Sequence, residues 1–156
     1  MTPKYEKQKC ECCGQTKTYV LPIDRGTADI VRALAHAVRL KGVNAVHVQK
    51  EMEVPMKEAN PIYGTVTSNQ VNNLSRPRFH GLIAFVRGER GVYCLTRKGA
   101  AFLRGEAIHK WAIVSKVEKH QVGYWYAYGP GDSRNMVTIA ELGLSPEYWE
   151  GLDGTG

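Results

Sequence analysis

Residues 87–91, with the sequence Arg-Gly-Glu-Arg-Gly, separate two short apolar runs at residues 83–86 and 92–95. Valine, isoleucine and aromatic residues make up five of the eight residues in the two runs, and such residues favour strands. The glycines between the runs permit the backbone reversal of a tight turn. The pattern therefore predicts a two-stranded hairpin with a basic tip, which carries Arg87 and Arg90.

Helices are expected on both sides of this hairpin, and the clearest one precedes it. Residues 28–41 contain neither glycine nor proline, and Asp24 or Thr27 can cap a helix that begins there. Gly42 suits the left-handed position that ends a helix. Apolar residues recur at helical spacing at Val31, Leu34, Ala35 and Val38. The segment is thus predicted to be a helix with one apolar face.

A second helical segment is expected just before the hairpin. Ser68 can cap its beginning, but Pro77 interrupts it. Proline lacks a backbone N–H and is tolerated only in the first turn of a helix. Either the helix kinks at Pro77, or Ser75 caps a second short helix that holds Pro77 in its first turn. After the hairpin, Thr96 can cap a third helix over residues 97–103.

The last third of the chain is expected to form a small antiparallel β element. Strand-like runs occur at residues 111–114, 124–128 and 136–139. Residues 124–128 are rich in aromatics, and their alternation favours one face in the core; a platform that stacks single-stranded nucleic acid is the alternative. A short helix is expected from Ala140 or Ser145 to Trp149, before a frayed tail at residues 151–156.

Length and composition favour a single globular domain. The chain has 156 residues, 43% hydrophobic and 23% charged, which is ordinary for a soluble protein. No apolar run approaches the roughly 18–20 residues of a membrane span, and the polar N-terminus does not resemble a secretory signal, so we expect a cytoplasmic protein. The expected parts are an arm at residues 1–23, a core at 24–105, a β extension at 106–150 and the tail at 151–156.

The positive charge of the chain is concentrated in its middle. The formal net charge is +6, and residues 68–110 contain eight arginine and lysine residues but only two acids, Glu89 and Glu106. The rest of the chain has 13 cations and 13 acids, so it is neutral. Arginine, which is the commonest of these cations, suits phosphate groups and base edges because its guanidinium is planar. The segment is expected to bind nucleic acid; a solvated surface without a partner is the alternative.

The residues around the hairpin carry a resemblance. The sequence His-Gly-Leu-Ile at residues 80–83 precedes it, and residues 93–103 read Tyr-Cys-Leu-Thr-Arg-Lys-Gly-Ala-Ala-Phe-Leu. This pattern resembles the winged-helix domains of many bacterial, archaeal and phage regulators, over about residues 27–105. With the N-terminal cysteines and the sequence Phe-Leu-Arg-Gly-Glu, it is also similar to a group of phage and prophage proteins. Pro77, in the middle of the expected recognition helix, departs from the family pattern.

The resemblance implies an α+β fold with a winged helix-turn-helix core and a DNA-binding function, such as that of a phage or mobile-element transcriptional regulator. In that family the hairpin forms the wing. The side chains suited to base edges or phosphates are Asn69, Gln70, Asn72, Asn73, Arg76, Arg78, Arg87, Arg90, Arg97 and Lys98. Regulators of this kind commonly read two half-sites as dimers, so a homodimer is expected, with the C-terminal β element as one candidate interface.

The N-terminal cysteines have the spacing of half a zinc site. Cys10 and Cys13 form a Cys-x-x-Cys-Gly sequence, the shape of a zinc knuckle. A tetrahedral site needs two more ligands, and the candidates are Cys12, His36, His47, His80 and Cys94. The alternatives are a degenerate knuckle and a cluster of reduced thiols without metal. Adjacent cysteines rarely bridge one another, so no disulfide framework is expected.

Catalysis has little support in the sequence. We find no phosphate-binding glycine loop, no Gly-x-Ser-x-Gly and no His-Glu-x-x-His. We therefore expect a protein that is not an enzyme. The first alternative to DNA binding is a protein-interaction module, such as a phage inhibitor of a host complex. The second is a hydrolase or redox enzyme that uses the cysteine cluster.

Overall fold

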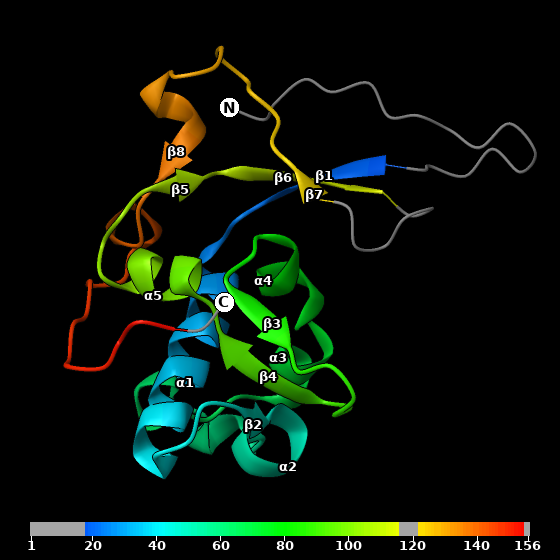
Figure 1. Ribbon diagram of the computed structural model, residues 1–156, viewed down its shortest axis with the longest axis vertical. Coiled ribbons are helices and arrows are strands. Elements are labelled where there is room, and N and C mark those ends of the chain that lie inside the picture. The colour runs from blue at the N-terminus through cyan, green and yellow to red at the C-terminus, as the bar shows by residue number, and fades with distance from the viewer. Residues whose placement is uncertain (1–17, 116–121, 155–156) are drawn as a thin grey trace, which may run out of the picture.

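The structure is a computed structural model that describes residues 18–115 and 122–154 (Figure 1). It is a mixed α+β fold with small antiparallel sheets. Its helices are α1 (Arg25–Lys41), α2 (Val48–Met52), α3 (Ser68–Asn72), α4 (Ser75–Phe79) and α5 (Arg97–Leu103). Its strands are β1 (Thr18–Pro22), β2 (Val46–His47), β3 (Ile83–Phe85), β4 (Val92–Leu95), β5 (Ile108–His109), β6 (Trp111–Ser115), β7 (Val122–Gly123) and β8 (Met136–Val137).

Helix α1 confirms the first expected helix. The Asp24 side chain accepts a hydrogen bond of 2.8 Å from the backbone N–H of Thr27, which caps the beginning of the helix. At the other end Gly42 has a φ of 64° and donates its N–H to the carbonyls of Arg39 and Val38. The apolar face lies in the core, where Val31 and Leu34 are fully covered.

The expected hairpin is confirmed as β3 and β4. With β2 it forms a three-stranded antiparallel sheet in the order β2-β4-β3, in which Ile83 faces Leu95 and Phe85 faces Tyr93. Thr96 then caps α5, because its hydroxyl accepts from the N–H of Gly99 at 3.0 Å and donates to the carbonyl of Gly81 at 2.6 Å. The helix begins and ends as the sequence predicts.

The segment before the hairpin divides into α3 and α4. The N-cap of α3 is Thr67, and not Ser68 as predicted, because Thr67 forms a reciprocal capping box with Gln70. The helix then breaks at residues 73–74, where Asn73 ends α3. Of the two expected arrangements, the structure has the one with two short helices.

Pro77 explains the position of the break. It is the third residue of α4, in the first turn, where its missing N–H does not interrupt a helical ladder. The Asn73 carbonyl, which a longer helix would pair with residue 77, accepts from the N–H of Arg76 at 3.3 Å instead. The predicted cap by Ser75 is wrong: Leu74 precedes α4 and makes no side-chain cap.

The C-terminal region extends the fold with two further small sheets, which lie above α1 and the β2-β4-β3 sheet in Figure 1. One has the order β1-β6-β7, and the other pairs β5 with β8. The strand predicted at residues 111–114 is confirmed. That at 124–128 is wrong, because only residues 122–123 pair with β6. The expected helix ending at Trp149 is not formed: of residues 140–149, all of which the structure describes, only Ala140–Leu142 are helical, as a short 3-10 turn.

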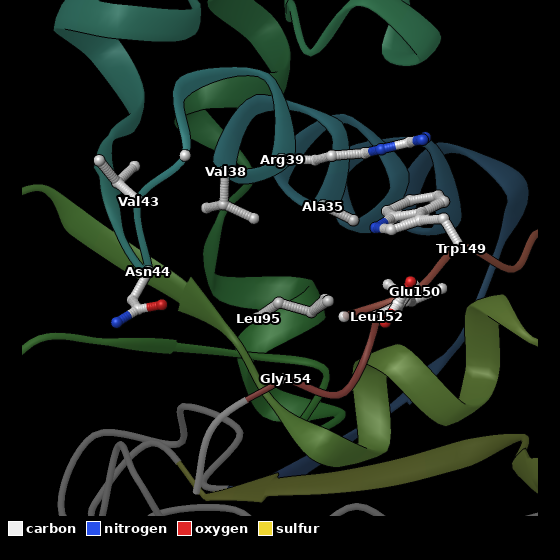
Figure 2. A pocket seen from close by; sticks show the side chains of 12 residues that line it. Ala35, Val38, Arg39, Val43, Asn44, Leu95, Trp149, Glu150, Leu152 and Gly154 are labelled. Atoms are coloured by element: carbon white, nitrogen blue, oxygen red, sulfur yellow. The ribbon is translucent and has the colours of Figure 1, made fainter.

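The end of the described chain packs against α1 and β4, so the expectation of fraying is wrong for residues 151–154. Leu152 is 2% exposed, and its carbonyl accepts a 2.7 Å hydrogen bond from Arg104. A pocket of about 330 Å³ lies between this segment and α1, and the Arg39 guanidinium at its edge is 4.6 Å from the centre of the Trp149 ring. Figure 2 shows Arg39 and Trp149 side by side at this edge.

A continuous hydrophobic core joins these parts. Residues from α1, from the β2-β4-β3 sheet, from α5 and from the C-terminal segment belong to the same buried cluster. The sheet extension and the C-terminal segment therefore stabilise the same core as the central helices. In the part of the chain that the structure describes, every helix is too short or too polar to cross a bilayer.

Candidate functional site

A groove of about 450 Å³ separates the end of α4 from the hairpin formed by β3 and β4. Arg78 of α4, Phe85 of β3, Tyr93 of β4 and Arg90 of the connecting turn line it. Arg87 is exposed in the same turn. The groove therefore brings together two predicted site residues, Arg78 from the helix and Arg90 from the hairpin turn, while Arg87 lies in the same turn but does not line the groove.

Aromatic rings support the guanidinium of Arg78. Its central carbon is 5.3 Å from the centre of the Phe79 ring and 5.5 Å from that of Phe85. Among the described residues, Arg78, Arg87 and Arg90 form no ion pair. Rings position a guanidinium without neutralising its charge. All three arginines therefore remain available to an anion.

The geometry of the turn depends on Gly91. Its φ is 81°, and a Cβ added there would lie 2.6 Å from the Nε2 of His47. His47 is itself fixed, since its Nδ1 accepts a 3.2 Å hydrogen bond from the N–H of Lys50 and caps α2. Only glycine readily adopts this positive φ and also leaves room for the His47 ring, so Gly91 sets where the hairpin leaves the sheet.

The predicted polar residues of α3 have a different arrangement. A groove of about 150 Å³ runs between α3 and the beginning of α1, and Asn69, Asn73 and Arg76 lie along it with Asp24. Nη1 of Arg76 is 3.2 Å from Oδ2 of Asp24. Asn73 donates its side-chain amide to the carbonyl of Asn69 at 2.9 Å. Arg76 and Asn73 are thus paired within the chain.

Gln70 and Asn72, the other two amide residues of α3, differ in whether their side chains are engaged within the chain. The side chain of Gln70 accepts from the N–H of Thr67 at 2.9 Å, which occupies its oxygen in the capping box. Asn72 is exposed, and Asn69 is exposed beside it on the same helix. Asn69 and Asn72 are therefore the exposed amides of α3 that take no part in its capping box.

Asp24 carries the negative charge in this region. Burial acts to raise its pKa, but the hydrogen bonds from Thr27 and the positive charge of Arg76 outweigh burial and hold the pKa below its ordinary value. The carboxylate is therefore charged at neutral pH. It both caps α1 and neutralises Arg76.

His80 lies beneath this surface, in the turn after α4. It is 1% exposed, and neither ring nitrogen makes a hydrogen bond of ordinary geometry to a described residue. The nearby backbone of Leu21 acts to raise the pKa of the ring slightly. Burial, together with the charges of Lys98 and Arg76, lowers its pKa from 6.5 to about 4. The ring is therefore neutral at neutral pH and acts as a core residue.

The last two predicted residues lie away from the groove, at the beginning of α5. Arg97 is exposed. Lys98 extends along Gly81 and donates to the hydroxyl of Tyr124 at 2.8 Å. The ten predicted residues therefore do not form one site: they divide among the hairpin, the helices α3 and α4, and the beginning of α5, where Lys98 contacts Tyr124.

Sequence reasoning missed Phe85 in the hairpin groove, and for the aromatic run at residues 124–128 it favoured a place in the core over a surface that stacks nucleic acid. Phe85 belongs to a predicted strand, and no sequence signal shows that it is 48% exposed at the end of that strand. Tyr124 and Tyr126 are each 41% exposed. Their alternation was a usable signal, because it places both on one face.

The predicted metal ligands Cys10 and Cys13 lie outside the described residues, as does Cys12. The other candidates do not meet. His36 bonds to Glu147 at 3.0 Å, His47 caps α2, and Cys94 is a half-buried free thiol. Within residues 18–115 and 122–154, no group of three or more histidine, cysteine or acidic side chains could hold a metal ion.

The arrangement offers unpaired guanidinium groups, exposed amides and exposed aromatic rings. These groups bind anions and flat rings by charge and by stacking. Comparison with known proteins adds no relative to this picture: no protein-family model, no curated protein and no solved structure matches the chain.

Proposed function

We propose that the protein is a winged-helix DNA-binding protein whose wing is the β3-β4 hairpin and whose recognition segment is α3 and α4. The order of elements supports the proposal, because α1 and the short strand β2 are followed by the short helix α2, by two 3-10 turns, by α3 and α4, and then by the hairpin. The sheet order β2-β4-β3 also fits, because it places the hairpin beside the strand that follows α1. The soluble, cytoplasmic setting of a phage-type transcriptional regulator is part of the same proposal.

One observation carries the proposal: Arg78 and Arg90 line one groove, Arg87 is exposed in the same hairpin turn, and none of the ion pairs among the described residues includes these three arginines, although Glu89 also lines the groove. Phosphate contacts supply most of the affinity of a protein for duplex DNA. In this proposal the wing arginines bind the backbone. Arg78, Asn69 and Asn72 are then the side chains left to read base edges.

The break between α3 and α4 affects how such a protein reads sequence. Each helix has five residues, so neither is a long rod that fills a major groove. With Gln70 and Asn73 engaged within the chain, few side chains remain for base contacts. We therefore propose that phosphate contacts dominate and that sequence preference is modest.

The proposal is tested by the binding of a labelled generic duplex across a series of salt concentrations. The logarithm of the binding constant should fall linearly with the logarithm of salt, by about 0.9 for each phosphate contacted. The Arg87→Ala/Arg90→Ala variant should bind more weakly, and its salt dependence should be shallower by the equivalent of up to about two phosphate contacts. Absence of binding by the parent at low salt would overturn the proposal.

A charge-matched control separates contact from net charge. Lys41→Ala/Lys57→Ala removes the same two charges, from the far end of α1 and from the loop after α2, where both side chains are exposed. This variant should bind as the parent does, apart from a small uniform loss. Equal losses in the two double variants would show that only the overall charge matters, and would contradict a site at the hairpin.

A second function is favoured by the groove itself. Phe85 is 48% exposed between two arginines, and aromatic and arginine side chains are enriched where proteins bind one another. As an alternative we propose a protein-interaction module that uses the same surface. It predicts no affinity for duplex DNA at low salt, and loss of a discrete protein partner when Phe85 is changed to serine.

A further inference from the structure

A cluster of three aromatic rings lies apart from the hairpin groove. The rings of Tyr124 and His109 are stacked, with centroids 3.9 Å apart and an interplanar angle of 26°. Tyr126 meets His109 edge to face at 5.8 Å. Tyr124 and Tyr126 are each 41% exposed, so part of both rings faces solvent. We name these three residues the aromatic cluster.

Trp125, the residue between the two tyrosines, shows that the side chains of this segment alternate between the interior and the surface. Trp125 is half-buried, and its ring lies perpendicular to that of Trp111 with centroids 6.2 Å apart. Trp111 is 2% exposed and belongs to β6. Alternate side chains of this segment thus point to the interior and to the surface, which places Tyr124 and Tyr126 together on the outside.

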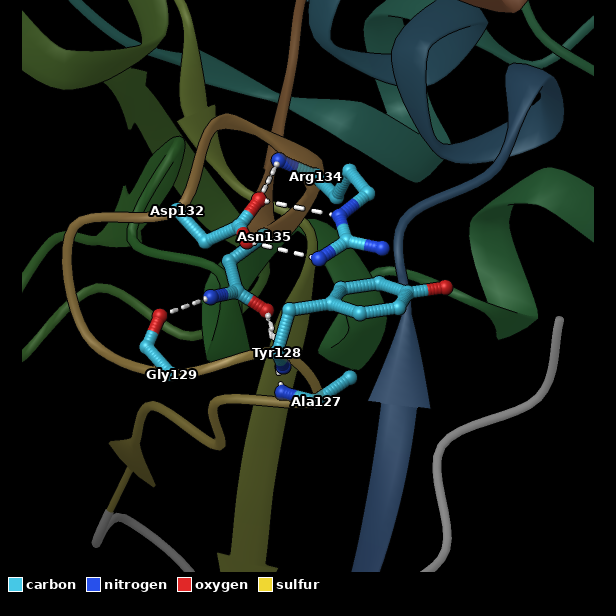
Figure 3. A network of polar contacts seen from close by, with 6 residues as sticks. All are labelled: Ala127, Tyr128, Gly129, Asp132, Arg134 and Asn135. Carbon is cyan, nitrogen blue, oxygen red and sulfur yellow. Dashed lines mark hydrogen bonds and ion pairs between the residues drawn. The ribbon is translucent and has the colours of Figure 1, made fainter.

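The backbone at residues 127–129, directly after Tyr126, is held by Asn135, which is 2% exposed (Figure 3). Its side-chain oxygen accepts from the N–H groups of Ala127 at 2.9 Å and Tyr128 at 3.3 Å, and its amide donates to the carbonyl of Gly129. The Arg134 guanidinium stacks 3.8 Å from the centre of the Tyr128 ring. The segment is therefore fixed without a regular strand, so its rings need little ordering on binding.

The ammonium group of Lys98 lies beside the aromatic cluster. Nζ of Lys98 is 2.8 Å from the Tyr124 hydroxyl and 4.9 Å from the centre of its ring. An ammonium group beside an exposed aromatic ring suits a ligand that has a flat face and a negative charge. Burial and the charge of Lys98 lower the pKa of His109, so its ring stacks in the neutral form.

We propose that the aromatic cluster stacks an unpaired nucleobase of a single-stranded nucleic acid, while Lys98 contacts the adjacent phosphate. This site shares no residue with the hairpin groove. The inference therefore stands even if the duplex binding proposed above fails. A base inside a duplex hides its faces in the stack, so the cluster distinguishes single strands from duplexes.

The test measures the fluorescence anisotropy of short labelled oligothymidylate and oligouridylate, which offer unpaired bases from DNA and from RNA. The full chain should bind at least one of them. The Tyr124→Ala variant should lower that affinity by roughly 5- to 150-fold, the range for one stacked base. Tyr124→Phe keeps the ring and loses only the bond to Lys98, so it should retain most of the affinity. Lys98→Ala should lower the salt dependence of binding.

Controls keep the proposal falsifiable. Tyr148 is 75% exposed and lies outside the cluster, so Tyr148→Ala should bind as the parent does. Thermal unfolding of each variant verifies the fold, and Tyr126→Ala provides a second substitution in the cluster. The proposal would be overturned if the parent bound neither oligonucleotide at low salt. It would also be overturned if the Tyr124→Ala variant bound normally while Arg87→Ala/Arg90→Ala bound weakly, because the strand would then lie at the hairpin.

Discussion

Nε2 of His36 lies 3.0 Å from Oε2 of Glu147, which joins the middle of α1 to a position 111 residues further along the chain. Nε of Arg32 lies 3.2 Å from the same oxygen. Trp149 then covers His36, with ring centroids 4.8 Å apart. The carboxylate of Glu147 therefore contacts two side chains of α1 and holds the C-terminal segment against the helix.

Replacement of Glu147 by glutamine should destabilise the fold. The variant keeps the shape of the side chain but removes the charge, and Arg32 is left 12% exposed without its anion. Such a loss costs about 2 kcal/mol in a partly buried site. Urea unfolding measures the difference. Glu150→Gln, an exposed neighbour, is the control, and equal stability of the two variants would refute the role of Glu147.

Two glycines of the hairpin turn should respond differently to alanine. Gly88 and Gly91 have similar φ values, 84° and 81°, but only a Cβ at Gly91 would meet another side chain, His47. Gly88→Ala should cost about 1 kcal/mol through backbone strain alone. Gly91→Ala should cost about 1 kcal/mol more, because it displaces the ring that caps α2.

Thermal or urea unfolding of both alanine variants tests this difference. The additional loss at Gly91 should largely vanish in a background in which His47 is already alanine, since the ring is then absent. If Gly88→Ala and Gly91→Ala are equally destabilised in the parent background, the contact with His47 does not matter.

Local signals predicted the elements that local interactions form. Asp24 and Gly42 cap α1 through bonds to residues within a few positions, and Thr96 does the same for α5. The hairpin followed from two apolar runs and the glycines between them. Such patterns are visible in a sequence because the interacting residues are neighbours in it.

The elements that sequence reasoning missed depend on distant partners. Residues 124–128 have the composition of a strand, yet Trp125 packs on Trp111 and Asn135 binds the backbone amides that a neighbouring strand would use. The tail is glycine-rich, yet Leu152 is buried. No local pattern contains these contacts, because their partners lie elsewhere in the chain.

The candidate site divides in the same way. The basic hairpin tip was predictable, because a turn between short strands places Arg87 and Arg90 in solvent. The engagement of Gln70 and Arg76 was not. The first depends on a cap at Thr67, and the second on the approach of α4 to Asp24. A list of suitable side chains therefore overstated how many are free to bind.

The stability of the protein should fall between neutral and mildly acidic pH because of His80. Its pKa is about 4 in the folded state and about 6.5 when unfolded, so the unfolded chain takes up a proton first. Acid therefore favours unfolding below pH 6.5, and the loss stops growing below the folded pKa. At a pH of about 5 the contribution is about 2 kcal/mol.

Urea unfolding at a pH of about 7.5 and of about 5, compared with a His80→Leu variant, isolates this contribution. Carboxylates titrate in both proteins and cancel in the comparison. The parent should lose about 2 kcal/mol more than the variant between the two conditions. Parallel losses in both proteins would mean that His80 is protonated as easily in the folded as in the unfolded state.

The ion pair between Asp24 and Arg76 leads to a prediction about the proposed DNA interface. Asp24 holds Arg76 at 3.2 Å and places a negative charge beside α3 and α4. Asparagine caps helices as well as aspartate does, so Asp24→Asn should preserve α1 while it releases Arg76. We expect the variant to bind a generic duplex roughly three- to tenfold more tightly at low salt, with a steeper salt dependence.

Glu58→Gln removes an equal charge from an exposed position in the loop after α2 and serves as the control. A gain confined to Asp24→Asn would place the duplex beside the beginning of α1, because only there does the lost carboxylate compete with a phosphate for Arg76. Equal gains in both variants would reduce the effect to net charge. Unchanged affinity in Asp24→Asn, with the helix intact by circular dichroism, would move the duplex away from α3 and leave the hairpin arginines as its contacts.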